Sequence, residues 1–295
     1  MNNTTKKAKN LSLSIALTHI AQVTTVAAFL YAVYKGSVEP GENYFSTTLA
    51  VFSGVFIIGG LFAIFISVAV RRDNESLKKI GKYLHEISHE IRDTVHRVSA
   101  DNYEENILED ELKCSTFVCQ QLSKLFSRLI KREVTVSIKL IEAGGQSLYA
   151  TTYCRSDQGS IRDKGSFENL RLHLNDGRNT ALDHALLRTT SHKISHFYAA
   201  DLKKMYESGD FQNERQNWQD CYRSAIVVPI RSHNFRGDIT GEDLGFLSID
   251  TETPNRLERD FHVDVVASVA DQLYSLMYTL RVERQKKEDR KSAEN

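Results

Sequence analysis

Two long apolar segments precede a charged remainder of the chain. The segment over 11–34 has no acidic or basic residue apart from His19, and the segment over 44–70 has none at all. A helix of about 20 residues crosses a hydrocarbon core of about 30 Å. The pattern therefore predicts two transmembrane helices, over 11–34 and 44–70.

Lysine and arginine flank these segments on the same side. They stand before the first segment and after the second, at Lys6, Lys7, Lys9, Arg71, Arg72, Lys78 and Lys79. Because such residues stay in the cytoplasm during insertion, we expect both termini to be cytoplasmic, with a short extracytoplasmic loop over 35–43. The predicted location is the inner (cell) membrane of a bacterium, with the chain as a multi-pass protein in the lipid bilayer.

Both segments carry residues suited to contacts between helices. Gly59, Ala63 and Ser67 recur at intervals of four, and small side chains at this spacing let helix backbones approach closely. We expect a membrane packing face there. His19 and Gln22 lie about one turn apart in the first segment. An ionisable residue inside a membrane is a candidate functional site by default, so this pair is a predicted polar site.

A third apolar pattern, with intervals of three and four, follows the second segment. Its members are Leu77, Ile80, Leu84, Ile87 and Ile91. This spacing is typical of the seam of a coiled coil. We expect a juxtamembrane signalling helix over 71–107 that pairs with a second copy, so that the protein is a dimer or a higher homo-oligomer.

The same helix contains two motifs that resemble catalytic ones. His85, Glu86 and His89 form HExxH, in which two imidazoles one turn apart bind zinc and the glutamate activates water. The helix is charged on most of its surface, so a zinc hydrolase is the remote alternative. The run over 88–92 (SHEIR) resembles the phosphoacceptor box of histidine kinases, but Thr94 stands where that family has proline. Too few residues follow for an ATP-binding domain, and the box is interpreted as degenerate.

Beyond Val98 the apolar spacing changes repeatedly between that of helices and that of strands. Helices are expected over 109–131, 180–188, 201–206 and from about 257 past 281, and strands over 134–140, 147–154, 193–198, 222–231 and 244–251. Gly144 and Gly145 predict a hairpin between the first two strands, and Asn179 is the expected cap of the first short helix. The order predicts an α+β fold.

Three stretches make this region similar to a GAF domain. They are RSAIVVPI over 223–230, GFLSID over 245–250, and the closing helix with Phe261 and VADQL over 269–273. The resemblance covers roughly residues 108–282. It implies a central antiparallel sheet of about six strands, helices on both sides, and a pocket between the sheet and the short-helix loops. It also implies a small-molecule or nucleotide ligand, or dimerisation through the first and last helices.

Seven polar residues are expected to point into this pocket. They are Thr151 and Tyr153 on the second strand, Asn179, Asp183 and His184 around the first short helix, and Arg223 and Ser224 at the start of a later strand. Arg223 is suited to a carboxylate or phosphate, which a guanidinium can hold through two hydrogen bonds. An ordinary ion pair is the alternative. Trp218 is a candidate lid.

Composition narrows the function further. The chain has 295 residues, of which 38 are basic and 38 acidic, so its charge gives no reason to expect a nucleic-acid partner. Its cysteines lack CxxC spacing and are expected to be reduced thiols; they are Cys114, Cys119, Cys154 and Cys221. No metal site and no catalytic set is assigned, so the chain is predicted not to be an enzyme. The cofactor content is left open.

These predictions combine into one arrangement. A cytoplasmic N-terminus over 1–10 and the membrane hairpin precede the signalling helix, a GAF-like sensor domain over 108–282 and a charged tail over 283–295. We expect a membrane-anchored signalling protein whose soluble domain senses a small molecule or mediates dimerisation and couples to the membrane helices. The alternative is a membrane-disrupting or pore-forming effector, for example in bacterial defence, gated by the same domain.

Overall fold

The computed structural model describes residues 77–100, 103, 106–157, 171–187, 196–215, 218–233 and 239–294. The predicted membrane segments lie outside these residues, and with them Gly59, Ala63, Ser67, His19 and Gln22. Within the described ranges, no helix combines the length and the apolar character needed to cross a bilayer. The chain divides into two compact units, Met1–Lys78 and Lys79–Asn295, and all labelled elements belong to the second.

The described part of the second unit is built on one antiparallel sheet with strand order β3-β2-β1-β6-β5-β4. The strands are β1 (Thr135–Gly144), β2 (Ser147–Arg155), β3 (Leu172–His173), β4 (Phe197–Ala199), β5 (Ser224–His233) and β6 (Ile239–Thr251). The predicted hairpin joins β1 to β2, and Gly145 in its turn has φ 66°, a conformation that glycine adopts without strain.

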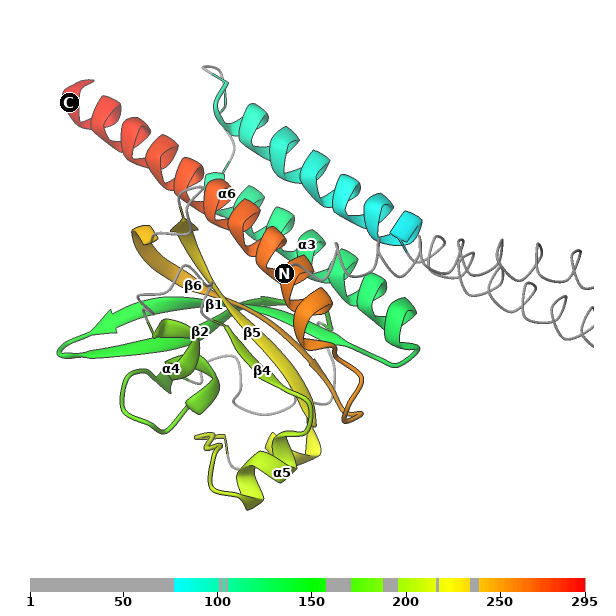
Figure 1. The fold of residues 1–295 in the computed structure, drawn as a ribbon. Helices are drawn as coiled ribbons and strands as arrows, with labels where there is room; N and C mark the ends of the chain where they lie inside the picture. The colour runs from blue at the N-terminus through cyan, green and yellow to red at the C-terminus, as the bar shows by residue number, and fades with distance from the viewer. Residues whose placement is uncertain are drawn as a thin grey trace, which may run out of the picture. The chain divides into compact units, whose positions relative to one another are not determined.

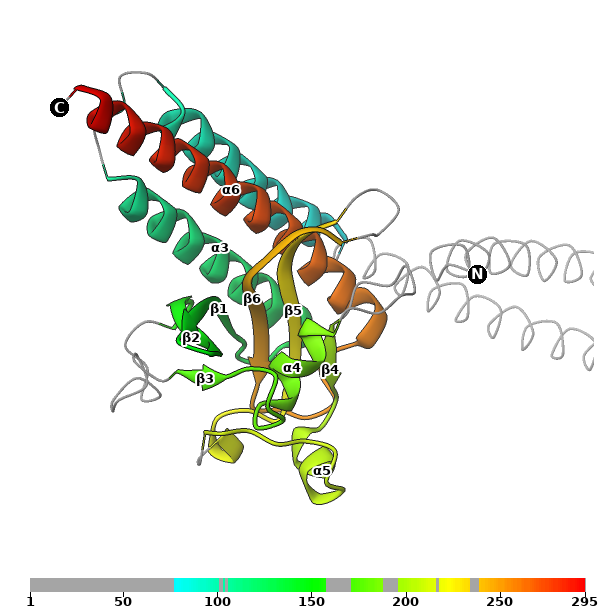
Figure 2. The ribbon, with the colours of Figure 1, turned by 90° about the vertical axis from the view of Figure 1, so that its left-hand side faces the viewer.

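Long helices cover one face of the sheet, and short elements cover the other (Figures 1 and 2). On the first face lie α3 (Ile107–Ile130), α6 (Arg259–Glu294) and the helix over 77–98. On the second lie α4 (Thr180–Leu186), α5 (Leu202–Glu207) and the short 3₁₀ helix η2 (Trp218–Asp220). The predicted α+β architecture, with a central antiparallel sheet flanked by helices, is confirmed.

Each face of the sheet has its own hydrophobic core. The helix-side core packs α3, α6 and the helix over 77–98 against the sheet, with Leu122 and Leu273 fully buried. The second core, which we call the loop-side core, contains Phe197, Phe211 and Trp218. Trp218 was the candidate lid, and the structure buries it, with its ring centroid 4.9 Å from that of Phe211.

A β-bulge in β2 decides which of its residues face the helices. Ile138 pairs with Cys154, whereas the next residue, Lys139, pairs with Thr152. The extra residue, Tyr153, packs against the helix-side core. Thr152 therefore lies on the loop side of the sheet, opposite to Tyr153.

The structure defines two helix ends. The charged tail belongs to α6, which continues to Glu294 with local pairs such as Lys286–Glu283 along its surface. Asn179 precedes α4 but makes no capping hydrogen bond. Its side chain is engaged elsewhere, because it bonds to other segments of the chain.

The apolar seam over 77–98 packs within its own chain. Ile80, Ile87 and Ile91 are buried in the helix-side core, Leu84 is partly buried against it, and Leu77 is exposed. Polar contacts follow the same surface, as Ser88 Oγ donates to Gln272 Oε1 of α6 at 2.9 Å. The helix shields this side of α3 and α6, so the seam predicted to receive a second copy is used to complete the domain core.

We predict that Ile87→Ala destabilises the folded domain itself. Ile87 is fully buried, and removing its side chain leaves a cavity that costs about 2–5 kcal/mol of unfolding free energy. Leu187→Ala, at an exposed position directly after α4, is the control and should change stability by less than about 0.5 kcal/mol. Thermal melting at several protein concentrations tests this: a loss of stability at Ile87 that disappears at high concentration would indicate intermolecular packing instead.

His262 is a buried hydrogen-bond acceptor in the first turn of α6. Its Nδ1 accepts from the backbone N–H of Glu258 at 2.8 Å, and its ring packs edge-on against Phe126, with centroids 5.2 Å apart. Burial lowers the pKa of His262 from its ordinary value of 6.5. The folded protein therefore favours the neutral ring.

We predict that acid destabilises the protein through His262. The unfolded chain binds a proton at this residue more readily than the folded one, so the contribution to stability is complete above pH 6.5 and is lost as the pH falls through the lower folded value. His262→Gln keeps an acceptor and does not titrate. Melting temperatures measured from about pH 7.5 to about pH 5 should fall less steeply for the variant, and parallel curves would refute this assignment.

Candidate functional site

A cavity of about 110 Å³ lies on the loop side of the sheet. All six strands contribute to it from the sheet, and α4, α5, residues 211–215 and Tyr222 contribute from above. The cavity thus occupies the place that the family resemblance implied for a pocket, between the sheet and the short-helix loops.

One wall of the cavity is polar and comes from three adjacent strands. Its sheet residues are Ser137 and Lys139 on β1, Thr152 and Arg155 on β2, and Ser248 and Asp250 on β6. Ser137 is paired across the strands with both Arg155 and Ser248, which places their Cβ atoms about 5 Å apart. Asn213, Arg215 and Tyr222 extend this wall from the segment that precedes β5.

Positive charge predominates in the cavity lining. Lys139, Arg155 and Arg215 line it together with a single carboxylate, that of Asp250. Arg155 also holds Asp157, with Nε to Oδ1 at 3.0 Å and Nη2 to Oδ2 at 3.3 Å. The lining itself therefore favours a ligand that carries negative charge.

Lys139 is partly buried among these groups. Burial at the cavity wall, with Arg155 beside it, lowers the pKa of Lys139 to about 8, and the carboxylate of Asp250 opposes this change. Its Nζ donates to Ser137 Oγ at 2.9 Å. A negative charge bound beside Nζ would stabilise the ammonium form.

The opposite wall of the cavity is apolar. Phe197 of β4, Ala225 and Val227 of β5, Leu182 of α4 and Leu202 of α5 line it, and all five belong to the loop-side core. The cavity is therefore two-sided, with charge over β1, β2 and β6 and hydrocarbon over β4, β5 and the short helices.

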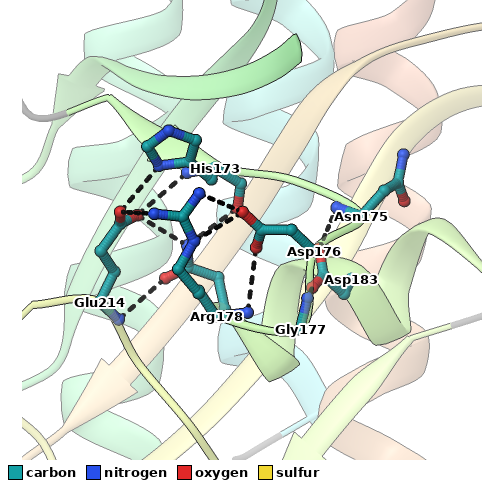
Figure 3. A network of polar contacts seen from close by, with 8 residues as sticks. His173, Asn175, Asp176, Gly177, Arg178, Asp183 and Glu214 are labelled. Carbon is teal, nitrogen blue, oxygen red and sulfur yellow. Dashed lines mark hydrogen bonds and ion pairs between the residues drawn. The ribbon is translucent and has the colours of Figure 1, made fainter.

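Glu214 is the centre of a polar network at the edge of the cavity (Figure 3). Its carboxylate accepts from the backbone N–H of His173 at 3.1 Å, from Asn179 Nδ2 at 3.1 Å and from Arg178 Nη1 at 3.3 Å. Asn179 Oδ1 in turn accepts from the backbone N–H of Glu214 at 3.2 Å. Burial alone would raise the pKa of Glu214, but the bonds from His173 and Asn179 lower it.

A second part of the same network shapes the turn before α4. Asp183 accepts from the backbone N–H groups of Asn175 at 2.6 Å and Gly177 at 2.9 Å (Figure 3). Both of these residues have positive φ, which a tight turn requires here. Together the two parts hold the segment over 171–179 against residues 211–215. These hydrogen bonds fix the backbone from which the side chains of Asn213 and Arg215 reach the cavity.

Of the seven predicted ligand-binding residues, Asn179 lines the cavity. Thr151 and Tyr153 lie on the other face of β2: Thr151 Oγ1 donates to Glu142 Oε1 at 2.6 Å, and Tyr153 packs against the helix-side core. The strand places their neighbour Thr152 in the cavity. Successive residues of a strand point to opposite faces, and the prediction assigned Thr151 and Tyr153 to the wrong face.

The remaining four predicted residues lie outside the cavity lining. Asp183 holds the turn described above, and His184 is exposed on α4. Arg223 makes an ion pair with Asp201, with Nη2 at 3.0 and 3.2 Å from the two carboxylate oxygens. It therefore has the ordinary ion pair that was the alternative to ligand binding. Ser224 Oγ donates to a backbone carbonyl of β4 at 2.8 Å.

Sequence reasoning missed the charged wall. Lys139 and Arg155 lie in or beside stretches that are predicted correctly as strands. A charged residue on a strand that is covered on both faces indicates a ligand or an ion pair, and this signal could have identified them. Arg215 lies outside every predicted helix and strand, where an arginine carries no such signal. Its place in the cavity follows from the bracing of residues 211–215 by Glu214.

None of the four cysteines lines the cavity. Cys119 Sγ lies 3.8 Å from Cys154 Sγ inside the helix-side core, and Cys114 is buried in the same core. Burial raises the pKa of Cys114 to about 12. These three thiols lie on the far side of the sheet and are not positioned to react with a molecule in the cavity.

The HExxH residues lie on the surface of the helix over 77–98. The rings of His85 and His89 are 4.1 Å apart between centroids, and Glu86 is paired with Lys82 at 3.7 Å. Arg92 Nη2 lies 2.6 Å from His89 Nδ1, so a cation already contacts one ring nitrogen of His89. Among the described residues, no group of three or more metal-ligating side chains comes together.

No family model and no curated protein matches this chain. Among solved structures, it is similar to the GAF domain of a phosphoenolpyruvate-protein phosphotransferase from Coxiella burnetii, with 14% identity and a TM-score of 0.44, over 70% of this chain and 98% of that one. It is also similar to a type II free methionine-R-sulfoxide reductase from Thermoplasma acidophilum, with 16% identity and a TM-score of 0.40, over 59% and 97% of the two chains. A methyl-accepting chemotaxis protein gives 16% identity and a TM-score of 0.40, over 60% and 98%.

We predict that Asn179→Ala loosens the edge of the cavity. The change removes hydrogen bonds to Glu214 and to the carbonyl of His173, and leaving such buried groups unpaired costs about 1–3 kcal/mol. Asp176→Asn is the control, because Asp176 is exposed in its pair with Arg178, and exposed ion pairs contribute little to stability. Hydrogen exchange should quicken over 171–179 and 211–215 in the first variant alone. Unchanged exchange there would show that the network does not brace these segments.

Proposed function

We propose that this chain is a membrane-anchored signalling protein in which a GAF-like domain binds a small molecule. The observation that carries the proposal is the cavity on the loop side of the sheet, with a charged wall of Lys139, Arg155 and Arg215 facing an apolar wall. A site with a few convergent polar groups and a titratable residue of shifted pKa is the usual form of a small-molecule site.

We infer binding and not catalysis as the role of this cavity. Its lining contains neither cysteine nor histidine among the described residues. The side chains that line the charged wall are suited to hold charge and hydrogen bonds. The proposal accordingly describes a protein that responds to occupancy of the cavity, with no chemical step.

A route for such a response runs from the cavity to the long helices. Arg231, fully buried on β5, donates from Nη2 to the carbonyl of Ala185 in α4 at 2.8 Å and pairs through Nε with Asp243 of β6 at 2.7 Å. The neighbouring Glu242 pairs with Arg281 of α6. Breaking a buried ion pair costs about 3–5 kcal/mol, so β6 resists a shift of α4 through Arg231, whereas the link from β6 to α6 is an exposed pair.

Residues 77–98 are the proposed output of this route. They pack on α6 and α3 in the helix-side core, and in the sequence they follow directly on the second predicted transmembrane segment. A ligand changes their pose only if it binds two poses of the domain with different affinity. The proposal is therefore that occupancy of the cavity biases the packing of α6 against residues 77–98.

We also propose that the protein lies in the bacterial inner membrane as a dimer or a higher oligomer. The apolar segments over 11–34 and 44–70 support the location. For self-association, the second unit offers large apolar side chains that its own cores leave exposed, namely Leu108 and Leu112 on α3 and Tyr278 on α6. Such side chains are suited to a contact between copies.

Native mass spectrometry of the full chain, purified from its host in mild detergent, tests the proposed function. We expect a bound small molecule on the wild-type protein and a much smaller bound fraction on Arg215→Gln, because Arg215 lines the cavity. Arg256→Gln is the matched control, since Arg256 is exposed between β6 and α6. Hydrogen exchange over 77–98 should differ between the occupied wild type and the empty variant.

Two results would count against the proposal. A molecule that binds equally to wild type and Arg215→Gln would lie outside the cavity. Identical hydrogen exchange over 77–98 in occupied and empty protein would show that binding in the cavity does not affect this helix. The proposed signalling route would then be wrong.

A further inference from the structure

The chemistry of the cavity restricts which small molecule fits it. Three features act together: the charge of the lining, a hydroxyl with an unmet hydrogen bond, and the apolar wall opposite. Each is an independent property of different residues, and each limits the ligand in a different way. The inference rests on the proposed function, since it names the ligand class of that site.

Ser248 supplies the observation that points to a ligand. It is 7% exposed, it lines the cavity, and its Oγ has no hydrogen-bond partner among the described residues. An unmet hydrogen bond of a buried hydroxyl costs about 1–3 kcal/mol. A hydroxyl donates readily to an anionic oxygen, and Ser248 is paired across the sheet with Ser137, beside Lys139.

The charged residues beside Ser248 favour an anion. Lys139, Arg155 and Arg215 outnumber Asp250 in the lining. Both arginines and Asp250 lie close enough to act on the pKa of Lys139, so the four groups form one cluster. An anionic oxygen placed among the cations would be held by charge-assisted hydrogen bonds, which are about twice as strong as neutral ones.

The apolar wall and the volume limit the rest of the ligand. Phe197, Leu202 and Val227 offer hydrocarbon and no hydrogen bond. An engineered cavity of about 150 Å³ accepts benzene. The cavity of about 110 Å³ therefore suits roughly four to six non-hydrogen atoms, part of them apolar. Inorganic phosphate would meet the charge but leave the hydrocarbon wall unused.

We propose that the cavity binds a compact carboxylate with a short apolar group. The carboxylate lies among Lys139, Arg155, Arg215 and Ser248, and the apolar group lies against Phe197 and Leu202. The class is that of monocarboxylates with about three or four carbon atoms, of which propionate and butyrate are the simplest probes.

Isothermal titration of the full chain in lipid nanodiscs, after exhaustive dialysis, tests the ligand class. At about pH 7, propionate and butyrate should give saturable binding. Propionamide is the matched neutral probe, since it has the same shape without the charge, and it should bind at least about tenfold more weakly. Affinity for propionate should fall as the pH rises past about 8, where Lys139 loses its proton in the empty site.

Two variants connect the binding to the cavity. Ser248→Ala should weaken propionate about fivefold to tenfold while leaving the stability of the empty protein unchanged or higher, because the hydroxyl has no partner to lose. Lys139→Met should weaken binding at least about tenfold and remove the fall in affinity above pH 8. Lys204→Met, on the exposed surface of α5, is the charge-matched control and should bind like wild type.

The outcomes separate the inference from the proposed function. Equal affinity for propionate and propionamide, or phosphate binding as tightly as propionate, would overturn the ligand class. If native mass spectrometry shows a neutral or cationic molecule that Arg215→Gln releases, the sensor stands and the carboxylate proposal fails. If no probe binds and the purified protein is empty, both fail.

Discussion

The central constraint on this structure is that both faces of its sheet are covered. Each residue in the buried part of a strand therefore enters either the helix-side core or the loop side, whereas the tip of the β1–β2 hairpin is exposed. Residues of β1 show the consequence: Ile138 is fully buried among the helices, whereas Ser137 and Lys139, on either side of it, line the cavity. A charged residue on such a strand has to be compensated by ions, by hydrogen bonds or by a ligand.

The sequence predicts the elements well and the facing of their residues poorly. Apolar spacing located α3 to within a few residues, and two glycines located the β1–β2 turn. The facing of β2 depends on a bulge at Tyr153, whose side chain packs against the helix-side core, and this bulge leaves no mark in the spacing. Arg215 is a second case, since its position is imposed by contacts of Glu214 with a segment about 40 residues earlier in the chain. Local patterns do not contain such contacts.

The seam over 77–98 illustrates a different ambiguity. Intervals of three and four place apolar residues on one stripe of a helix, and the stripe is the same whether another copy or the same chain covers it. Here α3 and α6 follow later in the sequence and bury Ile80, Ile87 and Ile91. The spacing predicted correctly that this stripe would be buried. Only the fold shows which helices cover it.

The packing of residues 77–98 also restricts how a signal can move. Sliding the helix by one turn would displace it by about 5.4 Å. That movement would withdraw Ile80, Ile87 and Ile91 from their sites and break the bond from Ser88 to Gln272. Each buried isoleucine removed costs about 2–5 kcal/mol, more than the differential affinity of a small ligand supplies. This packing therefore opposes a movement of the helix along its own axis, and it leaves a change in the direction of that axis as the motion that keeps the buried isoleucines in place.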